Sequence, residues 1–392
     1  MIKTVTFLVL AIFFVSCNSK LGHRNADYII QNVKMFDGDD VYSNSTIIIH
    51  NGNIQKIYTS QNTSFSGENV IDGRGLMVIP GLIDAHVHLE TIKQGKEAVK
   101  AGILTVLDMA HFSDSIIPSI KALRKLGDSL NYLPYFYSAG NPVTVPNGHG
   151  LQFHPYKTVS TVDELPSFIK KRVNEGSDFI KIIIERQGGK LSIITNEMIG
   201  TSIRLANDHD LMAVAHISER SYAIEASRMG IDGLCHFWYK NFKYGDTSKI
   251  SKEELDILIN NQVFVIPTIS IWKQIGERWG AFDIESMKEE IGKVHEAGIP
   301  ILAGTDAPGF DMNFGAVLHE EMQYLSECGI SNLDVLKTAT SNVSKAFGLG
   351  GKGFVKEGGS ADLLLIDGDP TEDISTISEI IGIWKKGVKV KQ

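Results

Sequence analysis

The chain has 392 residues, a formal net charge of −8 and 43% hydrophobic residues. This length suits one large domain or two smaller ones, and the ordinary apolar content argues against a disordered chain. The acidic balance and the lack of a run of lysine and arginine argue against nucleic acid as a partner.

The first twenty residues, MIKTVTFLVLAIFFVSCNSK, have the layout of a secretory signal, with an early lysine, a short apolar stretch and a small residue before a cysteine. The apolar stretch is too short to span a bilayer, which needs about 20 residues. The ending FVSC resembles a bacterial lipoprotein signal. That resemblance implies a signal peptide over 1–16 and a lipidated Cys17 that opens a tether over 17–26. We therefore expect an exported protein at the periplasmic or surface face of the cell envelope, which touches the membrane only through this anchor. The alternative is a plain signal with an incidental cysteine.

Two cysteines remain, Cys235 and Cys328. An exported protein could join them, but nothing in the sequence places them close together. We interpret both as buried thiols. No later stretch has the pattern of a transmembrane segment.

The chain after the tether opens and closes with β-like sequence. Short apolar runs separated by Gly, Asn and Asp fill residues 27–76, as in DYIIQNVKMFDG, and the last forty residues are similar. Between these ends, eight apolar runs occur in order: MVIPGLIDAHVHL, ILTVLDM, LPYFYSAG, FIKIIIE, LMAVAHI, DGLCHF, VFVIPTI and PILAGTD. Helix-like segments separate most of them, and several of these segments open on Ser or Thr in capping position.

Eight β-then-α units in roughly 270 residues match the size and order of a (β/α)₈ TIM barrel, so the predicted fold class is α/β. A doubly wound sheet is the alternative, but it gives no reason for reactive side chains at so many strand ends. In a barrel, active-site residues lie at the C-terminal ends of the strands. The polar residues that end the eight runs therefore test the prediction.

Six side chains suited to chemistry follow these strand ends. They are His86, His88, Lys181, His216, His236 and Asp306. His86 and His88 point the same way, because side chains alternate along a strand. Three histidine-bearing ends and an aspartate can bind one or two divalent metal ions, and zinc is the default for histidine-rich ligation. Taken singly, each residue could instead be a hydrogen-bonded core residue or a turn cap.

Lys181 is the unusual member of this set. A cationic lysine is repelled by a nearby dication and cannot be its ligand. It could serve only as a neutral amine or as a carbamate formed with carbon dioxide, which would supply an anionic bridging oxygen.

These motifs together resemble the metal-dependent amidohydrolase superfamily. The shared features are the histidine pair after PGLIDAHVHL, the lysine in FIKI, two later histidines and the aspartate in AGTDAP. The resemblance is strongest to the imidazolonepropionase-related and prolidase-like branch. It runs from about Asp27 to the C-terminus and includes the ending EGGSADLLLIDGDP. It implies a catalytic barrel over 77–351 and a small β-sandwich domain formed by 27–76 and 352–392.

The same resemblance implies a role for each site residue. It assigns His86, His88 and Asp306 to one metal ion, His216 and His236 to a second, and a carboxylated Lys181 to the bridge between them. A hydroxide shared by the two ions would attack the substrate, with Asp306 as general base and then acid. The NGHG loop, 147–150, resembles a Gly-Gly-His-Gly loop whose histidine faces substrate. We therefore predict that His149 binds substrate and helps to polarise its carbonyl group.

Two departures from the family pattern concern the substrate pocket. The family often has Glu-His-Gly at the sixth strand, where this chain has Cys235-His236-Phe237, so Phe237 and Trp238 become candidate pocket residues. Relatives often carry a histidine at the position of Ser218. Four cations are candidates to hold a substrate carboxylate: Arg186, Arg220, Lys273 and Arg278.

The leading hypothesis is a hydrolase of carbon–nitrogen (amide) bonds that uses two metal ions. Its predicted substrate is a small peptide, such as an Xaa-Pro dipeptide, or an N-acyl amino acid. One alternative is a cyclic amidase of the imidazolonepropionase type or a deaminase, which are usually built on one metal ion. A second is a non-catalytic ligand-binding surface lipoprotein. The sequence leaves open whether the chain forms a homo-oligomer.

Overall fold

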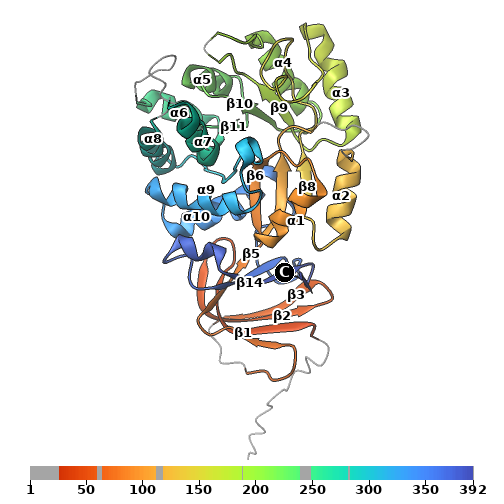
Figure 1. The fold of residues 1–392 in the computed structure, drawn as a ribbon, viewed down its shortest axis with the longest axis vertical. Coiled ribbons are helices and arrows are strands. Elements are labelled where there is room, and N and C mark those ends of the chain that lie inside the picture. The colour runs from red at the N-terminus through yellow and green to blue at the C-terminus, as the bar shows by residue number, and fades with distance from the viewer. Residues whose placement is uncertain are drawn as a thin grey trace, which may run out of the picture.

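The computed structural model describes residues 26–59, 64–111, 118–187, 189–238, 249–280 and 283–391. The predicted signal peptide, the lipidation site Cys17 and the tether up to residue 25 lie outside the described residues. Within the described ranges, no helix has the length and apolar character needed to cross a membrane. Figure 1 shows a β-sheet at one end of the molecule and a larger part of strands and helices, here called the α/β body, at the other.

Strands from both ends of the chain form one eight-stranded sheet, in the order β15-β14-β13-β5-β1-β2-β3 with β4 paired to β1. The strands are β1 (Tyr28–Phe36), β2 (Val41–His50), β3 (Asn53–Thr59), β4 (Val70–Asp72), β5 (Leu76–Pro80), β13 (Leu363–Asp367), β14 (Ile380–Lys385) and β15 (Val388–Lys389). The antiparallel pairing of β13 with β5 joins the two ends of the chain.

The first predicted barrel run, MVIPGLIDAHVHL, is divided between the two parts of the molecule. Its first residues belong to β5 in the eight-stranded sheet, and its remainder forms β6 (Leu82–Val87) in the α/β body. Gly81 lies at the division, where a Cβ atom would stand 2.5 Å from the Leu104 side chain. Only glycine therefore allows the chain to pass Leu104 on its way into the body.

The α/β body contains two parallel sheets. One is β6, β7 (Ile103–Asp108) and β8 (Tyr135–Ser138), and the other is β9 (Ile180–Ile183), β10 (Ala213–His216), β11 (Gly233–Cys235) and β12 (Phe264–Ile266). The eighth run, PILAGTD, forms a single bridge of Ile301 with Val265. The next residue, Ala307, forms a bridge with Val87, and a further bridge joins Val143 to Ile182. The α/β class is confirmed, whereas one closed eight-stranded barrel is not, because the described residues form two separate parallel sheets that single bridges, and not continuous strand pairing, connect to the eighth run.

Helices pack against these strands. The α/β body contains α1 (Ile92–Lys100), α2 (Ile120–Ser129), α3 (Leu165–Glu175), α4 (Asn196–Asn207), α5 (Arg220–Arg228), α6 (Lys252–Asn260), α7 (Ile269–Trp279), α8 (Ile284–Glu296), α9 (Ala316–Glu327), α10 (Asn332–Thr338) and α11 (Ser341–Phe347). Capping side chains open several of them as predicted, for example Thr195 on α4 and Ser251 on α6. Helix α5 differs, because its N-cap is Glu219 and no side chain caps it.

The strands of the α/β body have an outer face toward the helices and an inner face. Along β9 and β10, Ile180, Ile182 and Ala215 belong to the large core that includes the helix residues. The inner face carries a second, smaller cluster that includes Ile83, Ala85, Leu107, Met109, Val214 and Cys235. Cys235 is a buried free thiol, and so is Cys328 outside this cluster, as predicted.

Lys385, at the end of β14, joins the eight-stranded sheet to the α/β body. Its side chain is 1% exposed and donates hydrogen bonds to the carbonyl oxygens of Gly127, Leu130 and Leu133, at and beyond the end of α2. The ammonium nitrogen also lies 4.0 Å from the ring centroid of Tyr135. One cation therefore satisfies carbonyl groups that the end of a helix leaves free.

We predict that Lys385→Met destabilises the protein by about 2 kcal/mol or more, because buried carbonyls without a donor each cost about 1–3 kcal/mol. Urea unfolding followed by circular dichroism measures the change. The control is Lys389→Met, an exposed lysine on the neighbouring strand, whose effect should stay within about 0.5 kcal/mol. Equal effects of the two substitutions would show that the three carbonyl contacts contribute nothing specific.

Candidate active site

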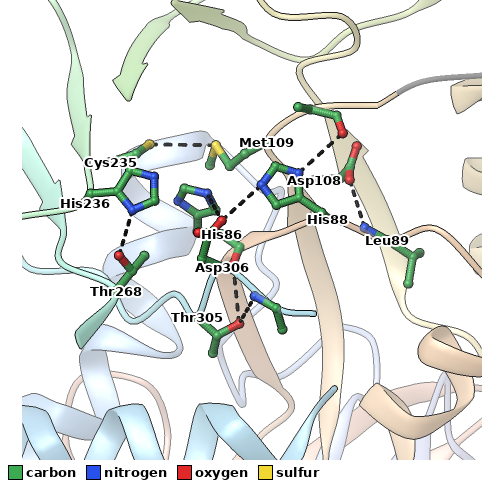
Figure 2. Close-up of polar contacts among 12 residues, drawn as sticks. His86, His88, Leu89, Asp108, Met109, Cys235, His236, Thr268, Thr305 and Asp306 are labelled. Atoms are coloured by element: carbon green, nitrogen blue, oxygen red, sulfur yellow. Dashed lines mark hydrogen bonds and ion pairs between the residues drawn. The ribbon is translucent and has the colours of Figure 1, made fainter. Parts of the chain in front are cut away.

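His86, His88 and Asp306 meet at one end of the α/β body. The Nε2 atoms of His86 and His88 each lie 3.0 Å from Oδ1 of Asp306, and Figure 2 shows both rings turned toward this carboxylate. These three side chains place ligand atoms within 4.8 Å of one another, close enough to hold one metal ion. The spacing of residues 86 and 88 on β6 thus brings two imidazoles to a carboxylate that lies more than 200 residues later.

His216 and His236 extend this cluster. The ring centroids of His216 and His236 are 4.2 Å apart, and those of His86 and His236 are 4.8 Å apart. His236 has a φ of +71°, the left-handed conformation. The sequence-predicted histidines from β6, β10 and the end of β11 therefore form one continuous group.

Lys181 lies on β9, paired with Val214 of β10. It is 4% exposed, and its Nζ has no hydrogen-bond partner among the described residues. Its charge contributes to lowering the pKa of His86, His216 and His236, so it lies near all three. A buried ammonium without an acceptor is costly, and a carbamate at this nitrogen would replace it by an anion facing the histidines. The orphaned nitrogen and its neighbours therefore fit a lysine that bridges two metal ions.

The ionisation states of the cluster also fit metal binding. Burial, helped by Lys181, lowers the pKa of His86 to about 3, and burial lowers those of His216 and His236 well below the usual value. Burial alone would raise the pKa of Asp306, but His86 and His88 outweigh it and hold that pKa well below its usual range. Burial alone would also lower the pKa of His88, but Asp306 outweighs it and raises that pKa. His86, His216 and His236 are therefore neutral imidazoles beside a carboxylate, which are protonation states that a metal ion binds, whereas a metal ion would compete with a proton at His88.

Asp84 fixes the position of Asp306 relative to His86. It is buried and accepts hydrogen bonds from His86 N at 3.1 Å and from Thr305 Oγ1 at 2.8 Å. The backbone N–H of Asp306 then donates to the carbonyl of His86 at 2.8 Å. Gly304 makes this approach possible, since a Cβ atom there would lie 2.8 Å from His86 N. The sequence prediction missed Asp84, although its place two residues before His86 was a usable signal.

Thr268 and Glu321 fix His236 from the other side. Thr268 is fully buried, has a φ of +51°, and places Oγ1 2.9 Å from His236 Nδ1. Glu321 on α9 accepts hydrogen bonds from Ile269 N at 2.8 Å and Ser270 N at 2.7 Å, the first two residues of α7. When His236 donates from Nδ1 to the hydroxyl, its Nε2 lone pair is free for a metal ion. Neither residue was predicted from the sequence.

His149 lies beside the predicted ligands. Its ring centroid is 4.5 Å from that of His216, and its Nδ1 is 3.1 Å from Nε2 of Gln187. Burial lowers its pKa to about 4, so it is neutral at neutral pH. A neutral imidazole at this place can donate one hydrogen bond to a substrate oxygen.

Phe237 and Trp238 do not lie in an open pocket. Both belong to the helix-facing core, at 0% and 5% exposure, with ring centroids 4.0 Å apart. The indole nitrogen of Trp238 donates to Glu290 at 2.6 Å. Their place in the sequence, directly after His236, suggested pocket residues, but the structure packs them outward.

The four cations considered for a substrate carboxylate already have partners. Arg186 makes a two-pronged ion pair with Glu219, Arg220 binds Glu254, Lys273 binds the Tyr324 hydroxyl, and Arg278 lies over the Phe310 ring. Each of these contacts holds the cation in the protein's own network. These contacts do not favour any of the four as the anchor of a substrate carboxylate.

The chain is similar to several known proteins. The model of a family described as the amidohydrolase family matches residues 77–390. An adenine deaminase of Lysinibacillus sphaericus is 22% identical over 391 residues, which cover 95% of this chain and 59% of the deaminase. The chain thus spans less than two thirds of that relative.

Solved structures show the same fold. The structure of a Xaa-Pro dipeptidase with bound methionine in the active site has a TM-score of 0.77 and 23% identity, and the match covers 93% of this chain and 100% of that one. The structure of a putative prolidase from Bifidobacterium longum also has a TM-score of 0.77, with 22% identity and coverage of 93% and 94%.

We predict that Thr268→Val lowers the metal affinity of the protein roughly 10- to 100-fold, because a partner that orients a ligating histidine contributes this much. Competition with a chromogenic chelator measures the affinity without reference to catalysis. Thr268→Ser keeps the hydroxyl and is the matched control. The role assigned to Thr268 is wrong if the valine and serine variants bind metal equally well.

Proposed function

The chain belongs to the amidohydrolase family, and on that premise we propose that it is a metal-dependent hydrolase of carbon–nitrogen bonds. The single observation that carries this proposal is the meeting of His86, His88 and Asp306 within 4.8 Å. The orphaned nitrogen of Lys181 adds support, because a buried cation at a cluster of histidines has no structural purpose of its own.

We assign the ligands to two divalent metal ions, with zinc as the expected metal because the neutral donors are histidines. His86, His88 and Asp306 would hold one ion, His216 and His236 the other, and a carbamate on Lys181 would bridge them. Ions bound there would polarise the scissile carbonyl and lower the pKa of water toward neutrality.

The chain's own residues supply the proton transfers. Asp306, ionised in the cluster, accepts the proton of the attacking water and returns it to the leaving amine as the carbon–nitrogen bond breaks. His149 donates a hydrogen bond to the carbonyl oxygen, on which negative charge develops. Gln187, 3.1 Å from His149 Nδ1, holds the imidazole in the orientation that this requires.

For the substrate, we propose a small peptide such as an Xaa-Pro dipeptide, or an N-acyl amino acid. The fold similarity to structures described as a Xaa-Pro dipeptidase and a putative prolidase supports this class. Single bridges from the two parallel sheets to Val143, Ile301 and Ala307, which lie outside the strands, support the further proposal that the eight runs complete a (β/α)₈ barrel.

We also propose that Cys17 is lipidated and that the hydrolase acts at the cell envelope. The sequence FVSC at the end of the short apolar stretch supports this. Metabolic labelling with palmitate should mark the wild-type chain and not Cys17→Ala.

A deaminase is the second candidate, because the adenine deaminase relative aligns with 95% of this chain. Deaminases of this family and cyclic amidases are usually built on one metal ion, so about two ions per chain favour the amide hydrolase and about one favours the alternative. Release of ammonia, rather than an amino acid, distinguishes deamination directly.

The full chain in detergent, loaded with zinc and bicarbonate, should release amines from a library of dipeptides and N-acyl amino acids. Asp306→Asn should keep its metal and lose roughly 10²- to 10⁴-fold in turnover, since it loses the general base. Amine-release assays with metal analysis of both proteins provide the comparison.

Two outcomes would contradict the proposal. Near-normal turnover by metal-loaded Asp306→Asn would remove Asp306 from the proton transfers. A blank across the library, from wild-type protein that carries two metal ions per chain, would reject peptides and N-acyl amino acids as substrates and turn attention to cyclic amides and deamination.

A further inference from the structure

Glu185 is a carboxylate on the inner face of the α/β body, and it follows the proposed metal ligand Lys181 along β9 and its extension. Side chains alternate along a strand, so Lys181, Ile183 and Glu185 share the inner face of β9 and its extension. Ile184 belongs to the helix-facing core, and its N–H donates to the carbonyl of His216 at 3.0 Å, which continues the ladder past Ile183, the last residue of β9.

The neighbouring strand has the same arrangement. Val214 of β10 lies on the inner face and Ile217 in the helix-facing core, so His216 and Ser218 follow on the inner side. Ile217 N donates to the carbonyl of Cys235 at 3.1 Å, which again extends the ladder. Glu185 and Ser218 therefore lie side by side on neighbouring strands. Both are closer to the C-terminal ends of these strands than Lys181 and His216 are.

The contacts of Glu185 tie it to the substrate side of the site. It is 5% exposed and accepts hydrogen bonds from the Ser218 hydroxyl and from Gln187 N. Gln187 in turn contacts His149, the residue proposed to bind the scissile carbonyl. A carboxylate has about four acceptor positions, so Glu185 keeps capacity for a further donor.

The separation between Glu185 and the proposed metal ligands suits a substrate group that lies next to the scissile bond. Residues two apart on a strand are separated by roughly 6.5–7 Å, so Glu185 lies about that far along the chain axis from Ile183, and twice as far from Lys181. Its side chain reaches back to Ser218, two residues after His216. In a dipeptide, the α-ammonium group is one carbon from the scissile carbonyl, and it is the substrate group that would meet a carboxylate here.

We propose that Glu185, held by Ser218, binds the α-ammonium group of a dipeptide substrate. The charges around the site favour this, because Glu219 already neutralises Arg186, whereas no cation among the described residues forms an ion pair with Glu185. An N-acyl amino acid has no ammonium group at this position. The inference rests on the proposed function and decides between its two substrate classes in favour of peptides with a free amino terminus.

The test compares alanyl-proline with propionyl-proline, which differ only in the α-ammonium group. Wild-type protein, loaded with zinc and bicarbonate, should prefer alanyl-proline in kcat/KM by roughly 10- to 100-fold, the value of a charge-assisted hydrogen bond. Glu185→Gln should abolish most of this preference by slowing the alanyl substrate, while the propionyl substrate stays within about threefold.

Two further variants sharpen the test. Glu219→Gln removes a carboxylate one residue after Ser218 and should keep the preference, because its partner is Arg186. Ser218→Ala removes the hydroxyl that holds Glu185 and should reduce the preference for alanyl-proline by a smaller factor than Glu185→Gln does. This variant tests the role of Glu185 if Glu185→Gln does not fold. Thermal unfolding of each variant monitors folding.

The outcomes separate the inference from the proposed function. Turnover of neither substrate by the wild type, together with a blank peptide library, rejects the function. Equal turnover of both substrates overturns the inference alone. A Glu185→Gln variant that slows both substrates equally also overturns it, since the residue would then act on His149 through Gln187 and not on the ammonium group.

Discussion

The site is organised around one buried cation that has no hydrogen-bond partner. Lys181 Nζ lies in the interior of the α/β body, near His86, His216 and His236, and the described residues give it no acceptor. An unpaired ammonium in this place opposes folding, and it repels the metal ions that the histidines would bind. Conversion of the amine to a carbamate reverses both effects. The carbamate oxygens would then attract the ions and link the proposed ligands that follow β6 to those of β10 and β11.

The proposed metal ligands are held by backbone conformations that stability alone does not favour. His236, Thr268 and Asp306 have φ values of +71°, +51° and +64°. Each such conformation costs about 1–3 kcal/mol in a residue other than glycine and persists only where its surroundings fix it. Here the surroundings are buried carboxylates: Asp84 holds the segment before Asp306, and Glu321 holds the start of the helix after Thr268. These acids keep the ligand nitrogens and oxygens converged.

The strand-end rule predicted which side chains lie together at the site because it needs only the alternation of side chains and the order of apolar runs. It placed His86, His88 and Asp306 together although more than 200 residues separate them. The comparison with the family pattern failed at Phe237, because the left-handed conformation of His236 interrupts the alternation, so that Cys235 faces the inner cluster while Phe237 packs outward. Glu321 could not be predicted at all, since it reaches the site from a helix whose packing the sequence pattern does not specify.

The central claim is that Lys181 becomes the anionic bridge of a two-metal site. The most direct measurement is ¹³C NMR of protein loaded with zinc and ¹³C-labelled bicarbonate, together with a metal count on the same sample. The account predicts one labelled carbamate and two metal ions per chain, with the carbamate signal absent and the metal count lower in Lys181→Met. An active protein that binds two metal ions per chain and shows no carbamate signal would contradict it.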